Sequence, residues 1–235
     1  MACILLLETA TKSCSVALER DGKLISLREN ASENYSHAEK VTLFIEAVMK
    51  ESGIAFSKLD AVAVSKGPGS YTGLRIGVST SKGICYAIEK PLIAVNTLLS
   101  MATQMKMRLG KNFSDSDLLC PMIDARRMEV YTAVFDASLR EINKTKALII
   151  DENSFSDLTE KHRIHCFGSG AEKCTSVFSN NKQLLIHQDF NLSATGMIAW
   201  AERAFLEQTF ENLAYFEPFY LKDFVAGTPN VKGLK

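Results

Sequence analysis

A glycine-rich segment between an apolar run and a helix-like run is the strongest candidate for binding chemistry. It reads Ser65-Lys66-Gly67-Pro68-Gly69-Ser70-Tyr71-Thr72-Gly73-Leu74-Arg75. Glycine lets a backbone approach a ligand closely, and free N–H groups at a helix start favour an anion. The spacing matches neither a Walker loop nor a dinucleotide G-x-G-x-x-G motif. Two interpretations stay open: a tight turn that positions a helix capped by Ser70 or Thr72, or an anion site. The anion site would use Gly67, Gly69, Ser70, Thr72 and Arg75.

The first turn of the chain, Glu8-Thr9-Ala10-Thr11, is a second place where phosphate could be held. Close approach of phosphate to a hairpin needs glycine, and no glycine occurs between Glu8 and Asp21. We therefore expect a plain hairpin in which Glu8 makes local hydrogen bonds. The sequence argues against an autonomous ATPase for the same reason.

The sequence lacks some of the residues that a metal site or a protease site would need. Two His at positions i and i+4 share one helix face and can chelate a metal, but the residue four positions after His37 is Val41. The six cysteines include no C-x-x-C pair. A serine mechanism at Ser70 needs a base, and no His is identified that would reach it. We expect no metal, no resident cofactor and no catalytic residue.

A helix after the glycine loop carries small residues at a spacing of four: Gly73, Gly77 and Ser81. Such a stripe lets another element approach closely, either the chain's own sheet or a helix of a partner. Sequence alone weighs the two equally, and both can hold on different faces. The candidate contact residues for a partner are His37, Val41, Phe44, Gly73, Ile76, Gly77, Thr80, Ser81 and Ile84.

Two further segments mix charge with turn or aromatic residues. Asp124, Arg126 and Arg127 lie between two predicted strands. They form either a turn in which Asp124 pairs with an Arg, or a basic rim for phosphate or an acidic patch. The segment from Pro218 to Lys222 can stack RNA bases or dock on the body of the protein, and we favour docking.

Hydrophobic periodicity predicts an α/β protein whose two halves each run strands first and helices later. Asp21-Gly22 is a hairpin signal, and the polar stretch 110–117 marks the boundary between two lobes, 1–110 and 111–235. A last helix at 193–208 can pack back on the first lobe. Strands are predicted at 3–8, 13–19, 23–27, 59–64, 91–95, 118–124, 128–135, 146–150, 164–167 and 184–187, and helices at 36–52, 74–89, 97–109, 154–160, 171–178 and 193–208.

Composition excludes several classes of protein. The 235 residues include 27 basic and 27 acidic ones, so no basic excess points to a stand-alone nucleic-acid binder. The longest aliphatic run, Ile4 to Leu7, is too short to cross a bilayer and follows no basic segment that would mark a signal peptide. Unpaired cysteines in apolar surroundings indicate a reduced, cytoplasmic protein.

The glycine segment and four others resemble the TsaB (YeaZ) family of bacterial tRNA-modification proteins. The other segments are Ile4–Thr11, Ser36–Glu39, Ile123–Tyr131 and Pro218–Lys222, in the same order along the chain. The resemblance is strong over residues 1–135 and diffuse from 136 to 214.

The resemblance implies an actin/hexokinase/Hsp70-like fold of two lobes, each a mixed sheet with packed helices. It also implies a non-catalytic subunit that binds a TsaD-like catalytic paralogue through helices of the first lobe, with a TsaE-like ATPase in a ternary complex. It would form a homodimer when alone, reach tRNA through the complex, and share an interface site for nucleotide. The alternatives are an actin-fold ATP-binding enzyme, such as a small-molecule kinase, and a glycoprotease-like peptidase.

Overall fold

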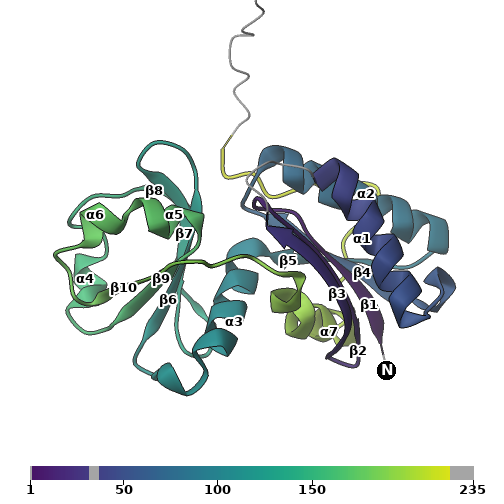
Figure 1. The fold of residues 1–235 in the computed structure, drawn as a ribbon, viewed down its shortest axis with the longest axis horizontal. Helices are drawn as coiled ribbons and strands as arrows, with labels where there is room; N and C mark the ends of the chain where they lie inside the picture. Colours follow the sequence, from purple (N-terminus) through teal and green to yellow (C-terminus); the bar gives the residue numbers. More distant parts are fainter. Residues whose placement is uncertain (1, 32–36, 223–235) are drawn as a thin grey trace, which may run out of the picture.

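The structure is a computed structural model that describes residues 2–31 and 37–222 and consists of two lobes lying side by side (Figure 1). A five-stranded sheet with order β3-β2-β1-β4-β5 forms the centre of the first lobe. The antiparallel part is a meander, and β4 and β5 run parallel to β1. Its strands are β1 (Cys3–Glu8), β2 (Ser13–Arg20), β3 (Lys23–Ala31), β4 (Ala61–Gly67) and β5 (Leu92–Asn96).

The second lobe repeats this topology. Its sheet has the order β10-β9-β6-β7-β8, in which β6 pairs antiparallel with β7 and parallel with β9, as β1 pairs with β2 and β4. Its strands are β6 (Leu118–Asp124), β7 (Glu129–Phe135), β8 (Glu141–Ile149), β9 (Ile164–Phe167) and β10 (Leu184–His187). Two lobes with one strand order confirm the predicted actin/hexokinase/Hsp70-like arrangement.

Alternating side chains of β1 fill both faces of the first sheet. Leu5 and Leu7 face a core shared with α1 (His37–Ser52) and α2 (Tyr71–Ile88). Ile4 and Leu6 face the opposite core, which contains η3 (Ala194–Met197) and α7 (Ile198–Leu206). All six residues of β1 are buried, as expected for a strand covered on both faces.

The second sheet is covered in the same way. One face packs on α4 (Ser156–Thr159), α5 (Ser169–Lys173) and α6 (Thr175–Phe178). The other packs on α3 (Thr97–Leu109), whose Leu98, Met101 and Met105 contact Leu119 and Phe167. Each half of the chain therefore gives its last helix to the sheet of the other half: α3 to the second sheet and α7 to the first.

Several predicted elements were wrong in their limits. The helix α2 begins at Tyr71 rather than Leu74, because the Ser70 hydroxyl accepts the Gly73 N–H at 3.2 Å and starts the helix early. The segment predicted as one helix at 171–178 is broken at Cys174 into α5 and α6. The last helix is a 3₁₀ turn followed by α7, and β8 starts five residues earlier than expected. Ser36, predicted to open α1, lies outside the described residues.

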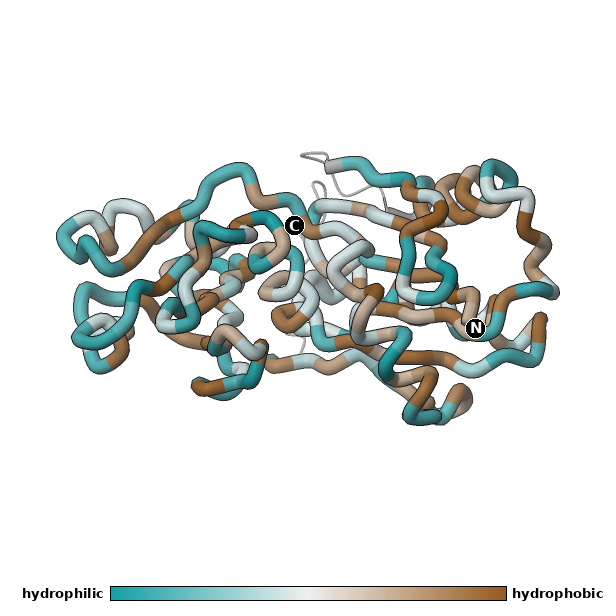
Figure 2. Tube along the Cα trace, turned by 90° about the horizontal axis from the view of Figure 1, so that it is seen from below, coloured by the Kyte–Doolittle hydropathy of each residue, from teal (hydrophilic) through white to brown (hydrophobic). Residues whose placement is uncertain are grey.

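Figure 2 shows hydrophobic stretches running through the interior of both lobes and hydrophilic stretches on the outer loops. The short 3₁₀ segments η1 (Phe56–Lys58) and η2 (Gly110–Asn112) connect α1 to β4 and α3 to β6. All six cysteines are free and buried. Within residues 2–31 and 37–222, no helix has the length and apolar character needed to cross a membrane.

Candidate functional site

The glycine loop is occupied by the chain's own first hairpin turn. The Ser70 N–H donates to the Ala10 carbonyl at 2.7 Å, and the Thr9 hydroxyl donates to the Gly73 carbonyl at 2.8 Å. A Cβ at Gly69 would lie 2.3 Å from the Ala10 carbonyl oxygen, and one at Gly73 would lie 2.1 Å from that of Thr9. The glycines thus let this turn seat against the start of α2, and the geometry favours the tight-turn interpretation.

The C-terminal end of the described chain also packs against this loop. Gly67 has φ = +113°, which glycine adopts without strain, and it precedes a cis peptide bond to Pro68. The Phe219 N–H donates to the Lys66 carbonyl at 2.7 Å, and a Cβ at Gly67 would lie 2.5 Å from the Phe219 carbonyl oxygen. The conformation of Gly67 therefore admits the C-terminal segment.

Glu8 lies fully buried beneath the loop. Its Oε1 accepts the Ala10 N–H at 2.7 Å and the Ser65 hydroxyl at 2.8 Å, which confirms the expected local hydrogen bonds. Its Oε2 has no partner within the described chain. Burial raises the pKa of Glu8 to about 7, although the hydrogen bonds from Ala10 and Ser65 act in the opposite direction.

The other residues predicted to contact an anion are spread over both lobes. Thr72 and Arg75 are exposed on α2, where the Arg75 guanidinium lies 4.3 Å from the ring centre of Tyr71. Arg126 and Arg127 are exposed in the β6–β7 turn with φ of 71° and 46°. No hydrogen bond or ion pair joins the two groups within the described residues, and anion or nucleotide binding by them stays a prediction.

Asp124 was expected to lie in a turn and pair with an arginine, and the predicted partner was wrong. Asp124 forms its ion pair with Lys173 of α5, not with an arginine. Its Oδ1 also accepts the backbone N–H of Arg126 at 2.9 Å. The same lysine donates to the carbonyl oxygens of Arg127 and Glu129, at 2.7 and 2.6 Å. The β6–β7 turn is thus fixed to α5, which leaves the two arginine side chains to solvent.

The candidates for metal and protease chemistry gain no partners. His37 opens α1, and its side chain lies outside the described part of the structure, whereas Val41 is buried in the core. Within residues 2–31 and 37–222, no three His, Cys, Asp or Glu side chains are grouped so as to hold a metal ion. The Ser70 hydroxyl oxygen accepts the Gly73 N–H and so caps α2. No described histidine hydrogen-bonds to this hydroxyl.

Four of the nine predicted partner-contact residues face the interior. Gly73, Gly77 and Ser81 lie on the buried face of α2, and Val41 lies in the core between α1 and the sheet. A Cβ at Gly77 would lie 2.3 Å from the Thr9 hydroxyl. Their prediction as partner contacts is corrected: helical spacing identified a close approach, but the element that approaches belongs to the same chain.

Two partly exposed members of that set, Thr80 and Ile84, line an apolar groove between α1 and α2. Phe44, Ile76, Thr80 and Ile84 are neither fully buried nor fully exposed. The groove encloses about 460 Å³ and includes four apolar residues that were not among the nine predicted contacts, Ile45, Met49, Ile54 and Phe56. Phe56 lies in η1, after the end of α1 at Ser52, and its side chain is 40% exposed. The groove is lined by Thr42, Ile45, Glu46, Met49, Lys50, Ile54, Phe56, Thr80 and Ile84.

The C-terminal segment docks on the body of the protein, as predicted for Pro218 to Lys222. Tyr220 packs on Tyr71 with ring centres 4.9 Å apart, and its hydroxyl accepts the Arg75 Nε–H at 3.4 Å. Lys222 then forms an ion pair with Glu129 of β7. The segment therefore links α2 of the first lobe to the sheet of the second.

A polar network in the second lobe was not predicted. The buried carboxylate of Asp117 accepts two hydrogen bonds from Arg163, at 3.0 and 2.9 Å, and lies 3.2 Å from Nε2 of His165. The Nδ1 of His165 lies 2.8 Å from Nε2 of His187. These residues are 46 to 70 positions apart from Asp117 in the sequence, so only the pairing of β6, β9 and β10 brings them together.

Comparison with known proteins places this fold in a family. Residues 29–234 match the model of the TsaD family, described as tRNA N6-adenosine threonylcarbamoyltransferase. The chain belongs to this family. Within the family it is similar to proteins named TsaB, which confirms the resemblance to the TsaB (YeaZ) family.

Relatives within the family differ in how much of them the chain matches. The Escherichia coli protein named tRNA threonylcarbamoyladenosine biosynthesis protein TsaB is 34% identical over 132 residues, 56% of this chain and 54% of that protein. An Erythrobacter litoralis tRNA N6-adenosine threonylcarbamoyltransferase is 41% identical over 86 residues, 37% of this chain and 23% of that protein. The match thus spans about half the length of the first of these and less of the second.

A solved structure matches nearly the whole chain. YeaZ from Pseudomonas aeruginosa has a TM-score of 0.77 and 23% sequence identity, with 94% of this chain and 100% of that chain covered. The two proteins share a fold over both lobes, including the region where the sequence resemblance is diffuse.

Proposed function

We propose that the chain is a non-catalytic subunit in the formation of threonylcarbamoyladenosine in tRNA, in the cytoplasm. The proposal rests on family membership together with the structure of the glycine loop. That loop is filled by the hairpin turn at Thr9 and Ala10 and by the backbone of Phe219, so its glycines support packing within the chain. A loop used in this way favours a scaffold over an actin-fold kinase.

The apolar groove between α1 and α2 supports the choice of binding surface. Its walls include Ile45, Met49, Ile54 and Ile84, and exposed apolar patches on soluble proteins commonly mark interaction sites. The partner is a TsaD-like catalytic paralogue, which would carry the transferase chemistry. A TsaE-like ATPase would join as a third subunit, tRNA would bind through the complex, and the same groove would pair two copies when the chain is alone.

Light scattering after size exclusion tests the proposal, on the chain alone and mixed with the catalytic paralogue from the same organism. A one-to-one complex that replaces a homodimer is the expected result. Ile84→Glu should abolish both assemblies by placing a charge in the groove. Ile142→Glu, a matched change at an exposed position of β8, should leave both intact. A complex that survives Ile84→Glu would contradict the assignment of the groove.

Calorimetry with Mg-ATP separates the scaffold from an actin-fold kinase. A kinase should bind Mg-ATP at micromolar to millimolar concentration on its own, whereas the scaffold should show no heat of binding without its partner. Saturable binding and turnover by the isolated chain would count against the non-catalytic assignment.

A further inference from the structure

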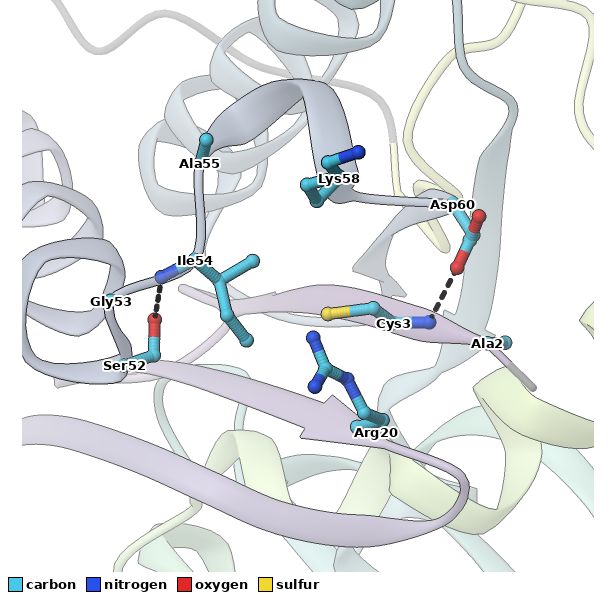
Figure 3. A pocket seen from close by; sticks show the side chains of 9 residues that line it. All are labelled: Ala2, Cys3, Arg20, Ser52, Gly53, Ile54, Ala55, Lys58 and Asp60. Atoms are coloured by element: carbon cyan, nitrogen blue, oxygen red, sulfur yellow. Dashed lines mark hydrogen bonds between the residues drawn. The ribbon is translucent and has the colours of Figure 1, made fainter.

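A cavity at the far end of the first sheet, away from the glycine loop, is lined by two cations that form no ion pair among the described residues. It lies between the ends of β1 and β2 and the connection from α1 to η1, and encloses about 690 Å³ (Figure 3). This volume is within the range of pockets that hold small organic ligands, roughly 300–1,000 Å³. Its lining residues are Ala2, Cys3, Arg20, Ser52, Gly53, Ile54, Ala55, Lys58 and Asp60.

The cations come from two different elements and lie on opposite sides of Cys3 in Figure 3. Arg20 is the last residue of β2, and Lys58 is the last residue of η1. Neither forms an ion pair with a carboxylate of the described residues. Two positive charges that line one cavity repel each other, and an anion between them would replace that repulsion with attraction.

The one carboxylate in the lining is held by the backbone instead. Asp60 Oδ2 accepts the Cys3 N–H at 2.8 Å, and the Asp60 N–H donates to the Cys3 carbonyl at 2.8 Å. Asp60 therefore extends the β1–β4 pairing and forms no ion pair with either cation, so the lining carries two positive charges against one negative charge. Its second oxygen offers an acceptor for a hydroxyl group at the rim of the cavity.

The chemistry of the lining points to one class of ligand. An arginine presents a planar fork that matches phosphate oxygens, and a lysine adds a compact point charge. Ala2, Ile54 and Ala55 supply an apolar wall, and Asp60 supplies a hydroxyl acceptor. We propose that this cavity binds a small organic phosphate, with the phosphate group between Arg20 and Lys58 and a hydroxyl of the organic part on Asp60. The site is separate from the proposed function and does not depend on it.

Calorimetry on the full chain with ribose 5-phosphate, inorganic phosphate and sulfate tests the proposal. Ribose 5-phosphate should bind saturably and more tightly than inorganic phosphate, and sulfate more weakly still. Arg20→Gln and Lys58→Gln should each weaken binding roughly tenfold or more, the loss expected for a hydrogen bond between charged groups. Lys144→Gln makes the same charge change at an exposed position of β8 and should leave the affinity unchanged.

The outcomes that would overturn the site are distinct from those for the partner surface. No heat with either phosphate at millimolar concentration would refute it, as would binding that survives both substitutions. Equal affinity for inorganic phosphate and ribose 5-phosphate would refute the roles of Asp60 and the apolar wall. Arg20→Gln and Lys58→Gln should still pair with the paralogue, so loss of phosphate binding alone would leave the proposed function standing. Both side chains are exposed, and an unchanged thermal midpoint establishes that the variants fold.

Discussion

The hydroxyl of Thr9 donates to the carbonyl oxygen of Gly73 at 2.8 Å, which fastens the first hairpin turn to the first turn of α2. Gly77, one turn further along the helix, lies against the same hydroxyl group. Gly73 and Gly77 of α2 thus face Thr9, and their small size sets how closely the helix approaches the turn after β1.

Replacing Gly73 with alanine should destabilise the protein. The new Cβ would lie 2.1 Å from the Thr9 carbonyl oxygen, a backbone atom that cannot move aside alone. We expect a loss of about 1–3 kcal/mol in the free energy of unfolding, the usual effect of overpacking. Gly77→Arg should unfold the lobe, because even a Cβ there would lie 2.3 Å from the Thr9 hydroxyl and the longer side chain has no room on this buried face. Urea denaturation followed by circular dichroism measures both.

Gly83→Ala is the matched control on the same helix. No atom lies within 4 Å of a Cβ built at this exposed position. Alanine there should stabilise the helix by about 0.5–1 kcal/mol. If Gly73→Ala and Gly83→Ala had equal effects, the packing role of Gly73 would be wrong.

Glu8 should make the protein less stable as pH rises. Burial raises its folded pKa from 4.5 to about 7. The folded state therefore holds a proton that the unfolded state releases, and stability falls between about pH 4.5 and 7. Glu8→Gln removes this group, so the thermal midpoint should decline less over the same range. An identical pH profile for the variant and the native chain would show that Glu8 titrates normally.

Tyr220→Ala should loosen the C-terminal segment from both lobes. It removes the ring contact with Tyr71 and the acceptor for Arg75, together worth about 1–2 kcal/mol locally. Hydrogen exchange should therefore speed up at the Phe219 amide, which donates to the Lys66 carbonyl. Tyr215→Ala, at a ring that is 84% exposed, is the control and should leave exchange unchanged.

Asp117→Asn should destabilise the second lobe, and the loss should be greatest above pH 4. Burial alone would raise the pKa of Asp117, but hydrogen bonds from Arg163, the Ser114 N–H and His165 together hold it below 3.8. Its charge thus contributes stability above about pH 3.8, and this contribution is lost as pH falls further. We expect a loss of about 1–3 kcal/mol at pH 7, because Arg163 is half exposed and solvent screens the pair.

Asp136→Asn provides the comparison for Asp117. Asp136 also binds an arginine, Arg140, but this partner is 81% exposed and lies four residues away on the same turn. Its substitution should cost under about 1 kcal/mol. Thermal unfolding of both variants at pH 7 and at a pH well below 3.8 separates the two cases. Equal losses would show that burial of Asp117 adds nothing.

Local sequence patterns were sufficient to predict most helices and strands, but not which elements pack against each other in the fold. The apolar run of β1 and the Asp21-Gly22 turn predicted a strand and a hairpin, because strand burial and turn geometry depend on adjacent residues. The stripe at Gly73 and Gly77 predicted a close approach without naming Thr9 as the element that approaches. Whether the element that packs against such a stripe belongs to the same chain or to a partner depends on tertiary packing. The sequence of the helix alone does not determine it.

The composition of the binding surfaces depended even more on tertiary packing than did the contacts between elements. Thr80 and Ile84 were predicted as contacts and line the groove, but Ile54 and Phe56 became part of it only where the end of α1 and the connection after it meet α2. The network of Asp117, His165 and His187 joins residues whose spacing matches no motif. Helix ends at Cys174 and Met197 were also missed, since both breaks occur within continuous helix-like sequence.

The exchange of α3 and α7 makes the two halves of the chain mutually dependent for folding. A chain cut between residues 110 and 111 would separate Met101 and Met105 from Leu119 and Phe167, and Ala201 from Ile4 and Leu6. Each fragment would expose a bare sheet face and an unpaired helix with the complementary face. Such fragments should recognise each other, as in fragment complementation, and the intact chain should unfold in one cooperative transition despite its two sheets.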